Sequence, residues 1–233
     1  MKKLLLGAFV FLAASISSFA GDVAAFVDLG ISSDGKTYIF GEYGRTDKKF
    51  QGYAEIYAVD IAKNDFIEGG IFRTLPSAAT ASKNGKKVYD ELYAKAGWWV
   101  KKYNCKPADA SHLLYVGDGT KSGDNEIVFK DFENSTEDKA YFYHVNMIKS
   151  VEGSGSNMHS SFYITFERKD EDGNVLSKNI VGSPDIKRKG VSGYKVERIF
   201  SDKTGKNLVF VIEKTIEDST GTSIRYMVET IRL

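Results

Sequence analysis

Three histidines, His112, His144 and His159, are the first residues that could act as metal ligands or general bases. His144 and His159 are expected on the two arms of one β-hairpin. Matching the apolar residues of the arms places His144 opposite Tyr163 and His159 opposite Ile148. Four residues at about 3.3 Å each then separate the imidazoles by roughly 13 Å, too far to share a metal ion. His112 has no Cys or His at ligand spacing, so the pattern indicates three unrelated histidines and no metal site.

The single cysteine, Cys105, is the next candidate because Lys101, Lys102 and Lys106 lie near it and could lower its pKa. No histidine can be placed beside it from the sequence, so a buried or incidental thiol is predicted rather than a nucleophile. One cysteine cannot form an intramolecular disulfide. The sequence also lacks a Gly-x-Ser-x-Gly elbow, a phosphate loop and a dinucleotide fingerprint. We therefore predict no catalytic, cofactor-binding or metal-binding residue.

Charged side chains leave two further possibilities open. The turns at 117–125 and 170–174 carry carboxylates that could bind calcium, but neither has the full ligand spacing, and a hairpin turn explains both. The run 187–189, Lys-Arg-Lys, is interpreted as a solvated loop. Paired acids of a hydrolase could be drawn from separate strands, although outward-facing, salt-bridged positions explain the same residues: Asp28, Glu42, Glu55 and Asp60.

Strands dominate the elements that must position these residues, because apolar side chains alternate with period two. Only three prolines interrupt the chain, which suits long strands. Strands are predicted at 23–31, 36–43, 53–61, 113–117, 126–132, 139–151, 158–168, 174–181, 194–200, 207–217 and 223–232.

One amphipathic helix is predicted at about 83–104, with Ser82 as N-cap and Pro107 beyond its end. Its aromatic residues are best interpreted as core packed on a sheet, although an aromatic ligand platform is the alternative. These aromatics are Tyr89, Tyr93, Trp98 and Trp99.

Residues 1–20 have the pattern of a secretory signal peptide, with Lys2 and Lys3 before an apolar stretch and a small-x-small site ending at Ala20. The apolar stretch is too short to span a membrane, and no later run approaches that length. Cleavage removes two lysines and no acid, which changes the formal net charge from +1 to −1. A near-neutral protein is not expected to bind nucleic acid or an anionic membrane. We predict an exported protein, periplasmic or extracellular, with residues 21–233 as a single β-rich domain.

The two ends of the mature chain resemble each other. Residues 26–40 can be laid over 196–210, allowing an extra residue before the second Gly-Lys, and 57–60 over 226–229. Each copy is predicted to be strand, Gly-Lys turn, strand, loop, strand, which suggests a duplication. The segment 31–40 also resembles the repeats of TolB-type β-propellers, although Ser33 stands where that family has proline. A closed propeller fits tightly into this length, so it is the alternative fold.

A closer resemblance is to a family of predicted secreted bacterial proteins of unknown function. It is carried by 26–44, by 54–66 (Ala-Glu-Ile-Tyr-Ala-Val-Asp-Ile-Ala-Lys-Asn-Asp-Phe) and by Gly69-Gly70. The resemblance implies export and a β-rich body, and it supplies no catalytic residues.

These observations predict a mainly β fold of about ten antiparallel strands, arranged as a sandwich or a curved barrel-like sheet, with one packed helix. The favoured function is a non-catalytic envelope protein that binds another envelope protein, a glycan or a small ligand. Tyrosines would supply contact surface, among them Tyr38, Tyr43, Tyr53, Tyr141 and Tyr163. The alternative is an envelope hydrolase whose catalytic acids come from separate loops.

Overall fold

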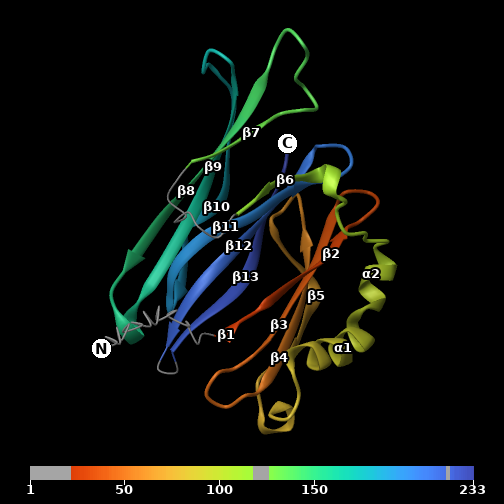
Figure 1. The fold of residues 1–233 in the computed structure, drawn as a ribbon, viewed down its shortest axis with the longest axis vertical. Coiled ribbons are helices and arrows are strands. Elements are labelled where there is room, and N and C mark those ends of the chain that lie inside the picture. The colour runs from red at the N-terminus through yellow and green to blue at the C-terminus, as the bar shows by residue number, and fades with distance from the viewer. Residues whose placement is uncertain (1–21, 118–125, 219–220) are drawn as a thin grey trace, which may run out of the picture.

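Three antiparallel-rich sheets and a helical segment lie in layers in the computed structural model, which describes residues 22–117, 126–218 and 221–233. Figure 1 shows the order of the layers, with the green and teal sheet at the upper left, the blue sheet in the middle, and the orange sheet with its yellow helices at the lower right. We call them the outer, central and N-terminal sheets. The prediction of a mainly β, sandwich-like fold with one main helix is confirmed. The layers do not radiate around an axis, so the propeller alternative is not supported.

The strands within each sheet follow mostly from consecutive hairpins. The N-terminal sheet contains, in spatial order, β2 (Ala25–Ile31), β3 (Thr37–Arg45), β4 (Gly52–Asp60) and β5 (Asp65–Thr74). The central sheet contains β1 (Asp22–Val23), β13 (Gly221–Arg232), β12 (Asn207–Asp218), β11 (Val191–Ser201) and β6 (Leu113–Val116). The outer sheet contains β10 (Val175–Lys189), β9 (His159–Asp170), β8 (Tyr141–Glu152) and β7 (Ile127–Lys130). Short 3-10 turns lie at Ala78–Thr80, Ala110–His112 and Gly155–Asn157.

The central sheet is buried on both faces. Leu208, Phe210 and Ile212 of β12 pack against the outer sheet, whereas Val209 and Val211 pack against the N-terminal sheet. All five are at most 1% exposed. A strand covered on both sides needs apolar residues at every position, which explains the unbroken apolar run in this part of the sequence.

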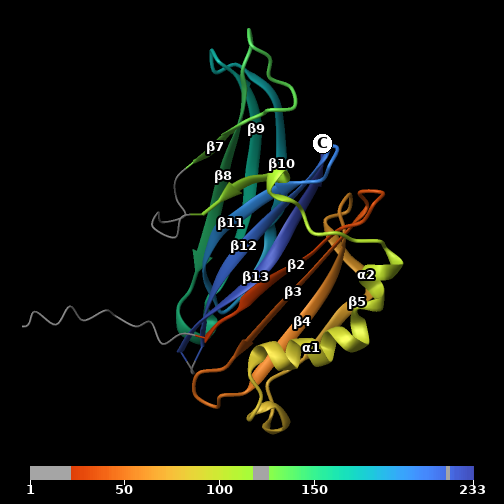
Figure 2. The same cartoon turned by 45° about the vertical axis from the view of Figure 1, so that its right-hand side comes forward.

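The N-terminal sheet separates the central sheet from the helices. Phe40 and Tyr57 point toward the central sheet, and their neighbours Ile39 and Ile56 point toward the helices, as alternation along a strand requires. Figure 2 shows the helical segment lying across the outside of this sheet. None of the helices in the described residues has an apolar stretch long enough to cross a membrane.

The predicted helix is two helices, α1 (Gly85–Ala96) and α2 (Trp98–Lys102). The N-cap is Asn84, whose side chain accepts a hydrogen bond from the Lys87 N–H, so the assignment of Ser82 was wrong. The segment divides at Gly97, where a Cβ would lie 2.9 Å from the ring of Tyr93. Glycine is also a weak helix former, which favours a break at this point.

The helix aromatics serve mainly as core, as expected. Tyr89 and Trp99 are buried in the cluster that joins the helices to the N-terminal sheet. Trp98 is 54% exposed and lies on the outer side of the segment. Only one of the four rings is exposed, so these residues do not form the shared aromatic surface that the platform alternative requires.

Two features of the sheets differ from the sequence prediction. Strand β5 was not predicted, because Gly69 with φ +71° shifts its register against β4 and breaks the alternation. In the outer sheet His144 lies opposite Glu167 and His159 opposite Glu152, so the predicted pairing with Tyr163 and Ile148 was wrong. Alternation had identified the correct faces, but the six-residue turn 153–158 sets the register.

The two terminal repeats form corresponding meanders. Gly35 N–H donates to the Ser32 carbonyl in the first turn, and Gly205 N–H donates to the Asp202 carbonyl in the second. The spacing is the same in both copies, so no extra residue is needed. In the third strand, however, Asp60 pairs with Thr37 and Arg232 with Asn207, so overlaying 57–60 on 226–229 was wrong.

Strand β13 forms much of one edge of the central sheet. Asp22 and Val23 of β1 cover this edge only at Ser223 and Ile224. Beyond them the edge of β13 runs past the N-terminal sheet toward the β4–β5 turn, where the Thr230 hydroxyl donates to the Ile61 carbonyl. This edge positions the site described next.

Candidate functional site

A cleft of about 520 Å³ opens beside β13, between the β4–β5 hairpin and β10. All three sheets therefore contribute to its walls. Four cations and two carboxylates line it: Lys63, Arg73, Arg188 and Lys214, with Asp65 and Glu229. The excess of positive groups makes the cleft a basic hollow on a protein with a nearly neutral composition.

An irregular stretch of β10 forms one wall. Ser183 pairs with Phe162 and Arg188 with Ser160, so five steps along β10 face two along β9. Gly182 starts this bulge with φ +80°, a conformation that favours glycine. Extra residues bend the strand and change the direction of its side chains. Ile186 is 53% exposed at the cleft, whereas Arg188 turns inward.

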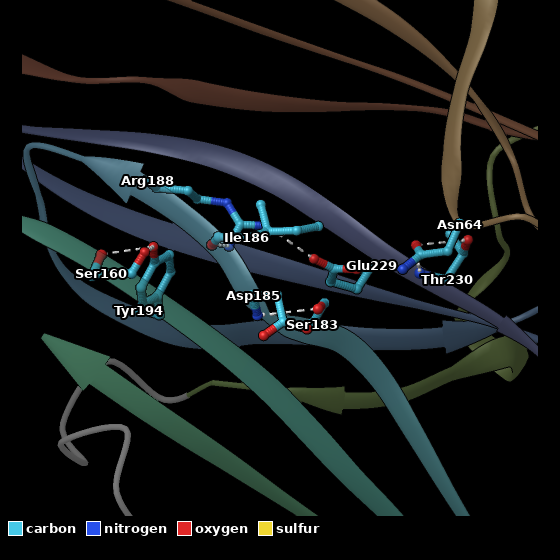
Figure 3. A network of polar contacts seen from close by, with 9 residues as sticks. All are labelled: Asn64, Ser160, Ser183, Asp185, Ile186, Arg188, Tyr194, Glu229 and Thr230. Carbon is cyan, nitrogen blue, oxygen red and sulfur yellow. Dashed lines mark hydrogen bonds and ion pairs between the residues drawn. The ribbon is translucent and has the colours of Figure 1, made fainter.

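Arg188 and Glu229 join β10 to β13 (Figure 3). The guanidinium Nη2 lies 3.4 Å from Glu229 Oε1, and the Asn64 amide donates to the other carboxylate oxygen. Arg188 also lies over the rings of Phe162 and Tyr194, at 5.0 and 5.8 Å from their centroids. Burial raises the pKa of Glu229. The run 187–189 lies in strand β10, so the prediction of a loop was wrong. Arg188 is also not solvated, whereas Lys187 is exposed and pairs with Glu152.

Lys214 is the unusual cation of the cleft. It comes from β12, and no carboxylate of the described residues forms an ion pair with it. Burial lowers the pKa of Lys214, although the charge of Glu42 opposes this effect. Lys214 is partly buried at the wall of the cleft, and a partly desolvated ammonium without a counter-ion carries a cost that an anionic ligand would offset.

Aromatic rings form the wall on the N-terminal sheet. Tyr57 stacks on Phe40 at 5.0 Å and on Phe66 at 5.3 Å between centroids. Phe66 is 47% exposed, which is unusual for a large ring in a stacked row. Arg73 lies 5.5 Å from the Tyr57 centroid, so a cation borders the same rings. The wall can hold a flat apolar group next to positive charge.

The edge of β13 borders the cleft between two capped positions. The Tyr226 N–H donates to Glu42 and the Thr230 N–H donates to Asn64. Both N–H groups therefore point away from β12. Val228, which lies between them and lines the cleft, has the same orientation by the alternation of an antiparallel strand. Its outward N–H and C=O have no partner strand in the described residues.

Glu42 and Glu55, two of the proposed acid candidates, lie directly opposite each other on β3 and β4. Burial raises the pKa of Glu42 to about 7, and the charge of Glu55 acts in the same direction. Glu55 accepts from the Tyr57 hydroxyl and lies 3.1 Å from Arg73. Neither carboxylate lines the cleft.

The other two acids lie elsewhere. Asp28 accepts hydrogen bonds from the Tyr38 hydroxyl and the Ala108 N–H, and burial raises its pKa. Asp60, at the end of β4, lies 3.8 Å from Lys63 at the surface. The structure thus brings together one of the proposed carboxylate pairs and separates the remaining acids.

Three histidines remain apart. Eight residues of β8 separate the positions of His144 and His159, which corresponds to roughly 26 Å, about twice the predicted distance. His144 lies 3.0 Å from Glu126, and His112 lies 3.8 Å from Asp109. No group of three His, Cys, Asp or Glu residues within the described ranges could hold a metal ion.

Cys105 is buried, and burial raises the pKa of its thiol to about 12. The nearby lysines therefore do not activate it, in agreement with the prediction of a buried thiol. The 170–174 turn is closed by Asn174, whose backbone N–H and side-chain amide both donate to the Asp170 carboxylate. The other calcium candidate is the turn 117–125, and its residues 118–125 lie outside the described residues.

The prediction that tyrosines supply contact surface was partly wrong. Tyr38 is fully buried and Tyr53 is 3% exposed, whereas Tyr43, Tyr141 and Tyr163 are half-buried. The hydroxyl of Tyr53 donates to Asp22. The aromatic residues that do face the cleft, Tyr57 and Phe66, were not predicted as contact residues.

Arg188, Lys214 and Glu229 were also missed. Each is a charged residue in a predicted strand or loop, Arg188 within the Lys-Arg-Lys run, and such residues are usually solvated. The signal that could have revealed Lys214 is its place two residues after the unbroken apolar run 208–212 of β12. No local signal marks Arg188, because the β10 bulge that turns it inward depends on pairing with β9.

The fold and cleft define a layered β-protein with a solvent-accessible ligand-sized hollow. The family model described as "Predicted secreted protein (DUF2259)" matches residues 39–232, and the chain belongs to this family. The sequence resemblance to secreted proteins of unknown function is thereby confirmed, and residues 1–20, the predicted signal peptide, lie outside the described residues. No curated protein and no solved structure matches the chain.

Proposed function

We propose that the protein is an exported, non-catalytic binding protein of the bacterial envelope, periplasmic or extracellular, and that the cleft beside β13 holds a small ligand. The supporting observation is the composition of the cleft. An aromatic wall that ends in the exposed ring of Phe66 and inward-facing cations come from three sheets, and a volume of about 520 Å³ lies within the range of ligand pockets. Secretion agrees with the family description.

Binding is favoured over catalysis because the cleft carboxylates are already engaged. Glu229 is held by Arg188 and Asn64, and Asp65 accepts from the Phe66 N–H at 2.7 Å. General acid–base catalysis needs a carboxyl group within reach of the substrate proton. The closely paired acids, Glu42 and Glu55, do not line the hollow.

The test uses a variant that fills the cleft. Ile186→Trp adds bulk at the mouth, and Ile180→Trp is the matched control because Ile180 is 61% exposed on the same strand and does not line the cleft. The purified exported chain is incubated with an envelope extract and examined by native mass spectrometry. A small-molecule adduct is expected on the unmodified protein and on Ile180→Trp, but not on Ile186→Trp. An adduct that survives in Ile186→Trp would refute the assignment of the cleft.

A hydrolase is the second candidate, and the Glu42–Glu55 pair is the observation that favours it. A broad screen with chromogenic esters, glycosides and phosphates should show no turnover by the binding protein. Turnover that disappears in Glu55→Gln would replace the binding proposal with the enzymatic one.

A further inference from the structure

We propose that the ligand of this cleft is an organic anion with a flat apolar body, whose anionic group pairs with Lys214 while the body lies against the exposed ring of Phe66. This inference rests on the proposed binding function and adds the chemical class of the ligand. Phosphate esters, carboxylates and sulfonates share the required chemistry.

The first step is the charge balance around the cleft. Arg188 is compensated by Glu229 at 3.4 Å, and Arg73 by Glu55 at 3.1 Å. Lys63 is a surface lysine beside Asp60. Lys214 is then the cleft cation that no described carboxylate pairs with. Asp65, the remaining carboxylate of the lining, forms no ion pair among the described residues and accepts from the Phe66 N–H. An incoming anion would therefore find its uncompensated positive charge at Lys214, which is the condition for electrostatic selectivity.

The second step is whether the protein itself supplies an anion to Lys214. Glu42 is the carboxyl whose charge acts most strongly on this ammonium. It does not form an ion pair with Lys214, and one of its oxygens accepts from the Tyr226 N–H. With its pKa raised to about 7, Glu42 carries only part of a negative charge near neutral pH. Lys214 consequently keeps its capacity for an external anion.

The third step concerns the body of the ligand. Phe66 and Ile186 line the cleft from different sheets, and their exposed fractions are 47% and 53%. Covering such side chains removes apolar surface from water, so an apolar body adds to the affinity. Phe66 is the exposed ring of the stacked pair Tyr57–Phe66, and its free surface favours a flat group over a bulky one.

The unpaired edge of Val228 agrees with an oxygen-bearing ligand. Its N–H lies on the edge away from β12, beside the cleft that Val228 lines, and can donate to a ligand there, as edge N–H groups do in strand-addition complexes. Lys214, Arg73 and this N–H are all donors, which matches the acceptor-only oxygens of a carboxylate, sulfonate or phosphate.

The experiment compares two dyes that differ by one charged group. Anilinonaphthalene sulfonate is a flat anion, and N-phenylnaphthylamine is the same ring system without the sulfonate. Fluorescence titration of each dye is carried out on the full exported chain and on four variants: Lys214→Met, the control Lys178→Met on an exposed lysine of β10, Ile186→Trp and Ile180→Trp.

Lys214→Met keeps the length of the side chain and removes its charge. It should weaken the binding of the sulfonate dye about tenfold or more, because a charge-assisted hydrogen bond is lost, and leave the affinity for the neutral dye unchanged. Lys178→Met should alter neither dye. Circular dichroism checks that each variant keeps its β structure.

Each alternative outcome has a distinct meaning. If Lys214→Met affects neither dye or both equally, while Ile186→Trp blocks both, the anion inference fails and the binding cleft stands. If Ile186→Trp blocks neither dye, the proposed function fails as well. Absence of saturable binding of the sulfonate dye to the unmodified protein also overturns the inference.

A second measurement needs no substitution at Lys214. Benzoate should displace the sulfonate dye from the unmodified protein, and benzyl alcohol, its neutral counterpart, should not. Equal displacement by both compounds, or by neither, overturns the inference even where Lys214→Met fails to fold.

Discussion

Replacing Glu42 by glutamine should stabilise the protein above neutral pH. Glu42 is 2% exposed, and burial raises its pKa from 4.5 to about 7. Between these two pH values the folded state holds a proton that the unfolded chain has released, so stability falls as the pH rises. Each pH unit corresponds to about 1.4 kcal/mol, which gives a loss of about 3 kcal/mol that is complete above pH 7.

Glutamine avoids this loss because it has no proton to release and its oxygen can still accept from the Tyr226 N–H. Urea unfolding, followed by the fluorescence of buried Trp99, should give equal stabilities for both proteins near pH 4.5. At about pH 8 the variant should be more stable by about 3 kcal/mol. Glu68→Gln, at an exposed position of β5, is the control, and its free energy of unfolding should equal that of the unmodified protein at both pH values.

Parallel pH profiles for the Glu42→Gln variant and the unmodified protein would refute this reasoning. They would mean that Glu42 is ionised in the folded state and that Lys214 is its counter-ion. That result would also remove one support from the anion inference, because Lys214 would already be compensated.

Three further perturbations test other parts of the structure. Arg188→Met leaves the buried Glu229 carboxylate without its cation and should cost about 3 kcal/mol in urea unfolding, much of which Glu229→Gln in the same chain should restore; a loss below about 1 kcal/mol would contradict a buried pair. Asn84→Ala removes the cap that accepts from Lys87 N–H and should cost about 1 kcal/mol by the same measurement, whereas an unchanged midpoint would argue against the cap. Cys105, with its pKa near 12, should react with a disulfide reagent at about pH 8 far more slowly in the native protein than in urea, and equal rates would show an accessible thiolate.

Local patterns predicted the elements well where the local signals agreed. The hairpin turns at Gly35 and Gly205 were located correctly because glycine at positive φ and the flanking alternation gave the same answer. The same rules failed at β5 and in the β8–β9 register, where Gly69 and the 153–158 turn override the alternation. Alternation fixes which face a residue occupies, and the turn decides which residue it meets.

The candidate site was less predictable than the fold. Tyr57, Arg188 and Lys214 come from three different sheets, so no spacing along the chain relates them. Glu42 and Glu55 could be named as acids, but their cross-strand pairing and the burial of Glu42 depend on how the central sheet covers the N-terminal sheet.

By itself, the sequence determined the strand-rich architecture, the near-neutral charge and the secreted family, because these follow from residue types and their local periodicity. Tertiary structure decided where the cleft lies and which charges remain uncompensated in it. Pairing of distant charged groups depends on distances across sheets, and those distances are set by the β10 bulge and by the course of β13 over the N-terminal sheet. The presence of a lysine at position 214 is given by the sequence, whereas its lowered pKa and its lack of a counter-ion are properties of the fold.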